Sequence, residues 1–139
     1  MNSYYINEGR FLIPGTWRDQ SLTMFSSPAD APAEFSLVIS RDRVPSGMTS
    51  DAYARQQMAQ LPAGLPQFRL SRQDATQLDN APAVEAEFTW QSDKGPMHQW
   101  QVYVVHDWVA LTITATAPEG VFAKHLADLQ RLLSTFKFN

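Results

Sequence analysis

The sequence predicts an α+β fold, in which one twisted antiparallel β-sheet of about six strands is accompanied by two α-helices. Most of the chain consists of short segments that alternate apolar and polar residues, the period of a half-buried strand. Short turns join these segments, and short turns favour antiparallel pairing. Two further segments repeat apolar residues at helical spacing. The length of 139 residues fits one domain, residues 1–139, with a sizeable hydrophobic core.

In the N-terminal half, the pattern predicts three strands and then a helix. The strands cover residues 11–13, 19–25 and 35–40, and Pro14-Gly15 forms the turn after the first of them. Thr49 or Ser50 caps a helix over about residues 51–61. On this helix, one row of side chains consists of Ala54, Met58 and Leu61. The adjacent row consists of Tyr53, Gln57 and Leu61.

In the C-terminal half, the pattern predicts four strands and then a second helix. The strands cover residues 67–72, 84–90, 97–105 and 108–116, with turns at Asp79-Asn80, Lys94-Gly95 and His106-Asp107. The helix begins after Pro118, which suits a first helical turn. Its apolar stripe is expected to consist of Phe122, Leu126, Leu129 and Leu133.

The composition offers little support for catalysis, metal binding or nucleic-acid binding. The 11 basic and 14 acidic residues give a net charge of −3 without a basic stripe, and cysteine is absent. His98 and His106 would lie about 26 Å apart on a straight strand, and His125 has no second ligand one turn away. We expect no enzyme activity, no cofactor and no bound metal, although Glu85 and Glu87 share a strand face that could support acid–base chemistry.

No segment predicts insertion into a membrane or export. The N-terminus has no basic region followed by an apolar run, and the most apolar stretch, residues 102–117, is interrupted by His106 and Asp107. We therefore expect a soluble protein that remains in the cytoplasm.

Strand alternation predicts a second, nearly uncharged sheet face. Residues grouped on the face toward the helices are Phe35, Leu37, Ile39, Val84, Phe88, Trp90, Trp100, Val102, Val104, Leu111 and Ile113. The opposite face then carries Gln20, Leu22, Met24, Ser36, Val38, Ser40, Met97, Gln99, Gln101, Tyr103, Thr112 and Thr114, with Glu85 and Glu87 as its charges. Solvated faces usually carry more charge, so this face suits covering another surface. A second core layer under loops and a dimer interface remain alternatives.

The order of several short motifs resembles the Eag-type chaperones of type VI secretion effectors, within the DcrB-related domain family. These motifs are IPGTWRDQSLTMF, VISRD, YARQQ, LPQFRL, the TW strand and WQVYVV, and they extend over nearly the whole chain. The resemblance implies a Mog1p/PsbP-like domain with a curved antiparallel sheet that works as a homodimer. It also implies binding, in the cytoplasm, of the N-terminal transmembrane helices of a PAAR-containing effector, and loading of that effector onto the secretion spike.

The resemblance also assigns groove residues. They are Leu22, Met24, Gln57, Leu61, Leu65, Met97 and Gln101, where the two glutamines would form hydrogen bonds to bound helices. Met24 and Met97 replace the usual Ile or Leu, and Leu61 occupies a position where a smaller apolar residue is common. Trp17 and Tyr103 are candidates for the dimer interface. The alternative function is a DcrB-like or PsbP-like domain that binds an envelope or membrane assembly.

Overall fold

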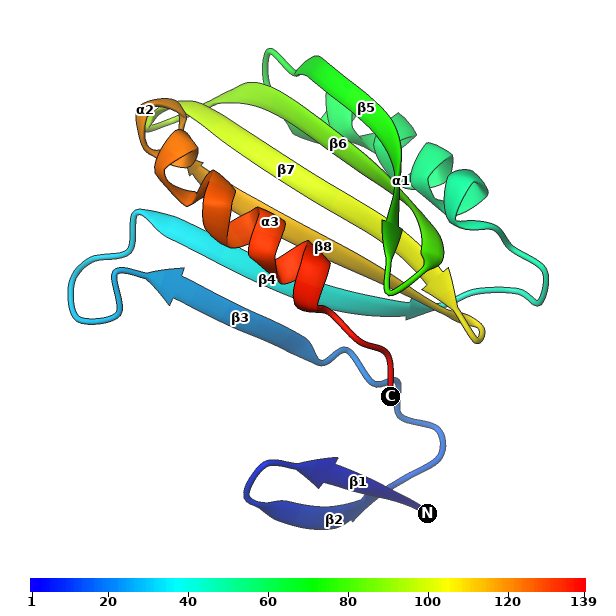
Figure 1. The fold of residues 1–139 in the computed structure, drawn as a ribbon. Helices are drawn as coiled ribbons and strands as arrows, with labels where there is room; N and C mark the ends of the chain where they lie inside the picture. The colour runs from blue at the N-terminus through cyan, green and yellow to red at the C-terminus, as the bar shows by residue number, and fades with distance from the viewer.

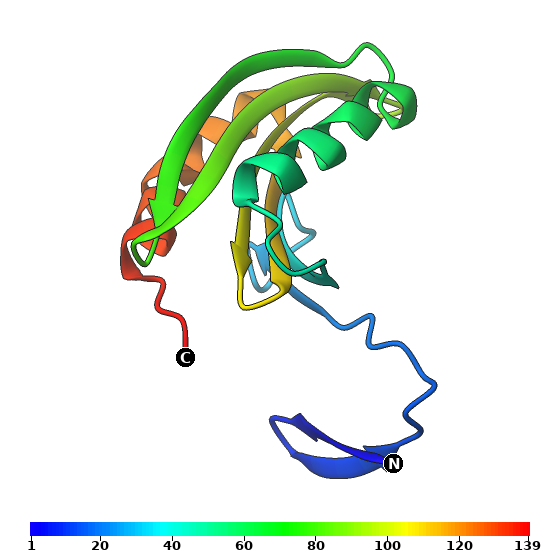
Figure 2. The same cartoon turned by 90° about the vertical axis from the view of Figure 1, so that its right-hand side faces the viewer.

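The computed structural model describes residues 1–139, and its main feature is a six-stranded sheet. The strands are β3 (Leu22–Ser27), β4 (Phe35–Arg43), β5 (Arg69–Leu78), β6 (Ala81–Ser92), β7 (Gly95–His106) and β8 (Val109–Pro118). All neighbours pair antiparallel in the order β3-β4-β8-β7-β6-β5. The sheet is strongly curved (Figure 2). The predicted α+β class with a curved antiparallel sheet is confirmed.

The two long helices, α1 (Ser50–Gly64) and α3 (Leu126–Thr135), cover opposite faces of this sheet. Figure 1 shows α3 in front of the sheet and α1 behind it. Tyr53 and Ala54 of α1 pack with Val84 and Tyr103, whereas α3 packs on the other face. The expectation that both helices share one face is wrong, because the protein buries apolar residues on both sides of the central strands.

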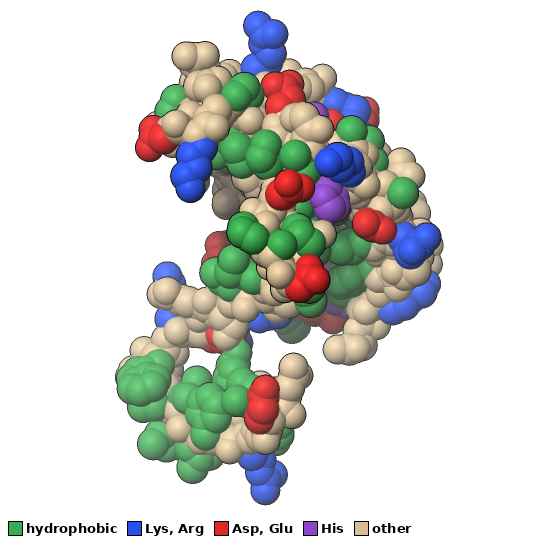
Figure 3. Space-filling view, turned by 90° about the vertical axis from the view of Figure 1, so that its left-hand side faces the viewer, with side chains coloured by type: hydrophobic (Ala, Val, Ile, Leu, Met, Phe, Trp, Pro, Cys, Tyr) green, Lys and Arg blue, Asp and Glu red, His purple; other side chains and the backbone are tan.

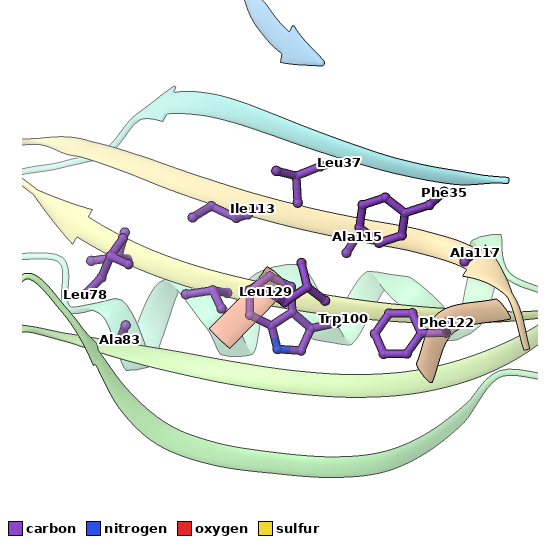
Figure 4. Packing of buried hydrophobic residues seen from close by; sticks show 12 residues of the cluster. Phe35, Leu37, Leu78, Ala83, Trp100, Ile113, Ala115, Ala117, Phe122 and Leu129 are labelled. Carbon is purple, nitrogen blue, oxygen red and sulfur yellow. The ribbon is translucent and has the colours of Figure 1, made fainter. Parts of the chain in front are cut away.

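The larger core lies between α3 and the sheet (Figure 4). Leu129 of α3 and Phe122 of the short helix α2 (Glu119–Phe122) pack over Trp100, Ile113 and neighbouring side chains. A 3₁₀ turn over Ala123–His125 separates α2 from α3, so the predicted continuous helix is interrupted. Within α3, Leu126 of the expected stripe is exposed while Leu129 is buried.

Two-residue turns close the β5–β6 and β7–β8 hairpins. Asp79 and Asn80 have positive φ angles of 49° and 67°, and Asp107 and Trp108 have φ angles of 49° and 65°. Positive φ at both central residues is the geometry of the hairpin turns that match strand twist. The β7–β8 turn therefore lies one residue later than the predicted His106-Asp107.

The N-terminus forms a separate two-stranded hairpin, β1 (Asn2–Ile6) and β2 (Gly9–Ile13). Only the second of these strands was expected from the sequence, and then only over residues 11–13. The hairpin does not pair with the main sheet. Figures 1 and 2 show it projecting from the body on the segment before β3.

Candidate functional site

The sheet face that carries α1 is only partly covered by that helix. Helix α1 packs on β6 and β7, through contacts with Val84, Ala86 and Tyr103. Ala110, near the start of β8, belongs to the same buried cluster as Tyr53 and Ala54 of α1. The same face of β3, of β4 and of the rest of β8 has no helix over it, and neither has the neighbouring edge of β7. We call this region the open strip; it consists of Leu22, Met24, Ser26, Ser36, Val38, Ser40, Gln99, Gln101, Thr112, Thr114 and Thr116, all exposed or half-buried.

Strand register shows that these side chains lie side by side. Met24 pairs with Val38, Val38 with Thr114, and Thr114 with Gln101. Three strand spacings place Met24 and Gln101 about 14 Å apart. An α-helix with side chains is about 10–12 Å wide, so the strip has the width of one helix. In Figure 3 the outline of the molecule is hollowed on the side that carries α1.

The open strip contains no charged residue, and its polar groups are already oriented by hydrogen bonds. Gln99 Nε2 donates to Thr116 Oγ1 at 2.8 Å, and Gln101 Nε2 donates to Thr114 Oγ1 at 3.2 Å. The Tyr103 hydroxyl donates to Gln101 Oε1. Burial, with a smaller effect from Tyr53, raises the pKa of Tyr103, so its hydroxyl stays protonated and holds the Gln101 amide in place.

Helix α1 forms one wall of the strip, and both of its ends are attached to the sheet. At the start, Ser50 Oγ accepts from Val105 N of β7 at 2.8 Å, and Thr49 Oγ1 caps the helix itself by accepting from Ala52 N at 3.0 Å. Beyond its end, Gln91 N donates to the Pro66 carbonyl oxygen at 2.8 Å. The wall that contains Gln57, Leu61 and Leu65 is therefore held at a defined position over the sheet.

The structure brings the predicted groove residues to this one face. Leu22 and Met24 lie exposed on β3, Gln101 lies in the strip, and Gln57 and Leu61 are half-buried on α1. Leu65 is the residue that caps the C-terminus of α1. Met97 pairs with Trp90 and with Pro118 at the far end of β7.

Three residues expected on the other face belong to this one. Val84 pairs with Tyr103, Phe88 with Gln99 and Trp90 with Met97, so all three lie on the α1 side. The error arose because the sequence pattern does not relate the alternation of one strand to that of the next. Trp90 Nε1 is buried without a hydrogen-bond partner at the Met97 end of this face.

Of the two candidates for the dimer interface, Tyr103 is only 1% exposed, which excludes it from an interface of the folded chain, whereas Trp17 is exposed.

Glu85 and Glu87 lie on the α3 face, which corrects their expected position. Arg72 bonds to both carboxylates at 2.8 Å, His98 Nε2 contacts Glu87 at 2.8 Å, and Trp100 Nε1 donates to Glu85 at 2.7 Å. Burial acts to raise the pKa of Glu87, but the hydrogen bonds from Arg72 and His98 outweigh it, so the pKa is lowered. A carboxylate with a lowered pKa is a poor general base, and this arrangement fits an ion network that joins β5, β6 and β7.

No three His, Asp or Glu side chains lie close enough together to hold a metal ion. None of the helices combines the length and apolarity needed to span a lipid bilayer.

Sequence comparison places the chain among known relatives. The DcrB family matches residues 8–135. The Pseudomonas aeruginosa protein named Effector EagT6 is 29% identical over 136 residues, which cover 97% of this chain and 94% of that protein. These matches confirm the resemblance to the Eag chaperones within the DcrB-related family.

Solved structures of similar fold agree with this placement. A Pseudomonas aeruginosa protein of unknown function, PA94, has a TM-score of 0.84 at 26% identity, over 100% of this chain and 97% of that one. Cyanobacterial PsbP from Synechocystis has a TM-score of 0.54 at 13% identity, over 97% and 89%. LpqN of Mycobacterium tuberculosis, which is involved in cell envelope biogenesis, has a TM-score of 0.54 at 14% identity, over 84% and 82%. The last two support the PsbP-like fold alone.

Proposed function

Because the chain belongs to the DcrB family and is similar to EagT6, we propose that it is a chaperone of a type VI secretion effector. In this proposal it binds the effector's N-terminal transmembrane helices in the cytoplasm and helps to load the effector onto the secretion spike. The observation that carries the proposal is the open strip, an uncharged and uncovered surface with the width of one helix. The whole chain, residues 1–139, acts as one binding domain, without catalysis or a cofactor.

Apolar contact supplies most of the binding free energy in this mechanism. The strip is about 14 Å wide, and the distance from the Leu22 row to the Met97 row is about 20 Å, so it covers about 280 Å² of a bound helix. If half of the covered helix surface is apolar, its removal from water contributes about 3.5 kcal/mol. Leu22, Met24, Leu61, Leu65 and Met97 provide the apolar surface of the chaperone.

Polar groups of the strip match those of a transmembrane helix. Membrane-spanning helices carry Ser, Thr and backbone groups that normally bond to other helices. Gln101 retains one free N–H beside its bonds to Thr114 and Tyr103, and Gln57 lies on the wall above the strip. These amides can satisfy the polar groups of a client helix without placing a charge against its apolar side chains.

A homodimer would present two strips to one client. Two strips can bind two helices of the same N-terminal region, so that the second contact becomes intramolecular and total affinity increases. The client that suits this arrangement is a PAAR-containing effector with at least two hydrophobic helices. No stable insertion of the chaperone into the membrane is required.

The test is co-expression with the N-terminal fragment of a PAAR-containing effector encoded beside this gene. The fragment is purified without detergent, alone and with the chaperone, and a fragment that lacks its hydrophobic segment is the control. We expect the hydrophobic fragment to remain soluble only in a complex with this chain, and the control fragment to leave the chain unbound. If the fragment aggregates while this chain elutes alone, the chaperone proposal fails and the envelope-binding alternative becomes the better explanation.

A further inference from the structure

The β1–β2 hairpin exposes apolar side chains that nothing in its own chain covers. Tyr5 is 67% exposed and Leu12 is 62% exposed, and Ile6 and Phe11 are also largely exposed. A segment of eight residues, 14–21, separates the hairpin from β3. An isolated two-stranded hairpin is at best marginally stable in water. The apolar hairpin therefore indicates that another surface packs on it.

A matching apolar pocket lies between β3 and α3. Its volume is about 160 Å³, and its apolar walls are formed by Phe25, Phe35, Leu37, Leu129 and Leu132. The pocket lies on the α3 face of the sheet, whereas the open strip lies on the α1 face. Ser26 at the edge strand lines the pocket and also borders the strip, but Leu22, Met24 and Gln101 of the proposed client surface do not line the pocket.

The hairpin and the pocket are complementary in charge as well as in polarity. On the hairpin, Tyr5 pairs with Arg10, and strand alternation places Leu12 on the same face. The pocket is lined by Asp128 beside its apolar walls. Neither Arg10 nor Asp128 takes part in an ion pair within the chain. Each surface therefore offers one unpaired charge next to apolar groups, with opposite sign.

We infer that the β1–β2 hairpin of one copy docks in the β3–α3 pocket of a second copy, and that the exchange is reciprocal. Leu12 and Tyr5 contact the apolar walls, and Arg10 lies opposite Asp128. Every chain has one hairpin and one pocket, so a two-fold exchange fills both pockets. A stable interface buries about 800 Å² on each partner, and in a reciprocal exchange each copy contributes both a hairpin and a pocket to this area.

This inference rests on the homodimer of the proposed function but not on the client. The test measures the mass and dimer dissociation constant of the full chain by sedimentation, for Arg10→Asp, for Asp128→Arg and for the two together. We expect the wild-type chain to be a dimer. Each single charge reversal should raise the dimer dissociation constant at least about 10-fold, and the double variant should return it toward the wild-type value. Glu8→Lys, a charge change in the hairpin turn, is the matched control. A double variant no tighter than the single variants refutes the inference.

A second measurement covers the case in which a charge reversal unfolds the chain. The protein has no cysteine, so Leu12→Cys with Ser27→Cys, in the hairpin and in the pocket lining, reports their contact directly. We expect oxidation to give a covalent dimer that neither single cysteine variant gives to the same extent. The eight-residue linker reaches about 26 Å, so docking within one chain is the competing geometry and would give a cross-linked monomer. A cross-linked monomer, or no cross-link, overturns the inference.

The two proposals fail in different ways. If the wild-type chain is a dimer that these variants do not alter, the hairpin exchange is wrong while detergent-free capture of the effector fragment still tests the chaperone. If the wild-type chain is a monomer, both the exchange and the homodimer are wrong.

Discussion

Placing negative charge on the β3 side of the open strip should abolish client binding and leave the fold intact. The change is Leu22→Asp combined with Met24→Asp. Both side chains point to the α1 face, and they are 59% and 64% exposed in the free chain. Because neither is part of a buried cluster, the free energy of unfolding should fall by no more than about 1 kcal/mol.

The expected loss of binding follows from the area that a client would cover. Full burial of a Leu or Met side chain contributes about 1.5–3 kcal/mol, and roughly 60% of each side chain is still available for burial. The two residues together then contribute about 2–4 kcal/mol, or a factor of about 30 to 1,000 in affinity. Placing carboxylates against an apolar helix adds a further desolvation cost.

The assay combines detergent-free pull-down of the effector fragment with circular dichroism and urea unfolding. Thr23→Asp is the matched control, because it adds a charge to the same strand on the opposite face. We expect the control to bind as the wild type does. If the double variant is folded and still binds the fragment, the strip is not the client surface and the reasoning is refuted.

Three further changes test other parts of the structure. Gln101→Leu removes the acceptor of the buried Tyr103 hydroxyl and should lower the free energy of unfolding in urea by about 1–3 kcal/mol; an unchanged value would refute this role. Thr49→Ala removes the cap of α1 and should lower Tm by about 3–4 °C, whereas Thr49→Ser should not. Arg72→Leu should cost about 1–2 kcal/mol at pH 7. Since Arg72 and His98 lower the pKa of Glu87, this contribution is present above the unfolded pKa of about 4.3 and is lost as pH falls through the lower folded pKa. An Arg72→Leu penalty that does not shrink in urea titrations below about pH 4 would contradict the assignment.

The strands and helices could be predicted because their signals are local. Alternation over β6, β7 and β8 and the capping Thr49 depend on residues within one element, and each of these elements was located to within a few residues. The hairpin turn at Asp79-Asn80 was equally clear, since both residues tolerate positive φ. Strand β1 was missed because the apolar residues of Asn2–Ile6 follow one another as Tyr4, Tyr5 and Ile6 and do not alternate with polar residues, so the pattern lacks the period of a strand.

What the sequence alone determined is the α+β class, the absence of cysteine and the uncharged character of Leu22, Met24, Gln99 and Gln101. Tertiary structure decided which residues share a face, because register between strands depends on pairing partners far apart in the chain. That is why Glu85 and Glu87 lie with α3, and Val84 and Trp90 lie with α1. Only the folded chain shows that α1 leaves β3, β4 and most of β8 uncovered, since the position of a helix over a sheet is determined by packing at both of its ends.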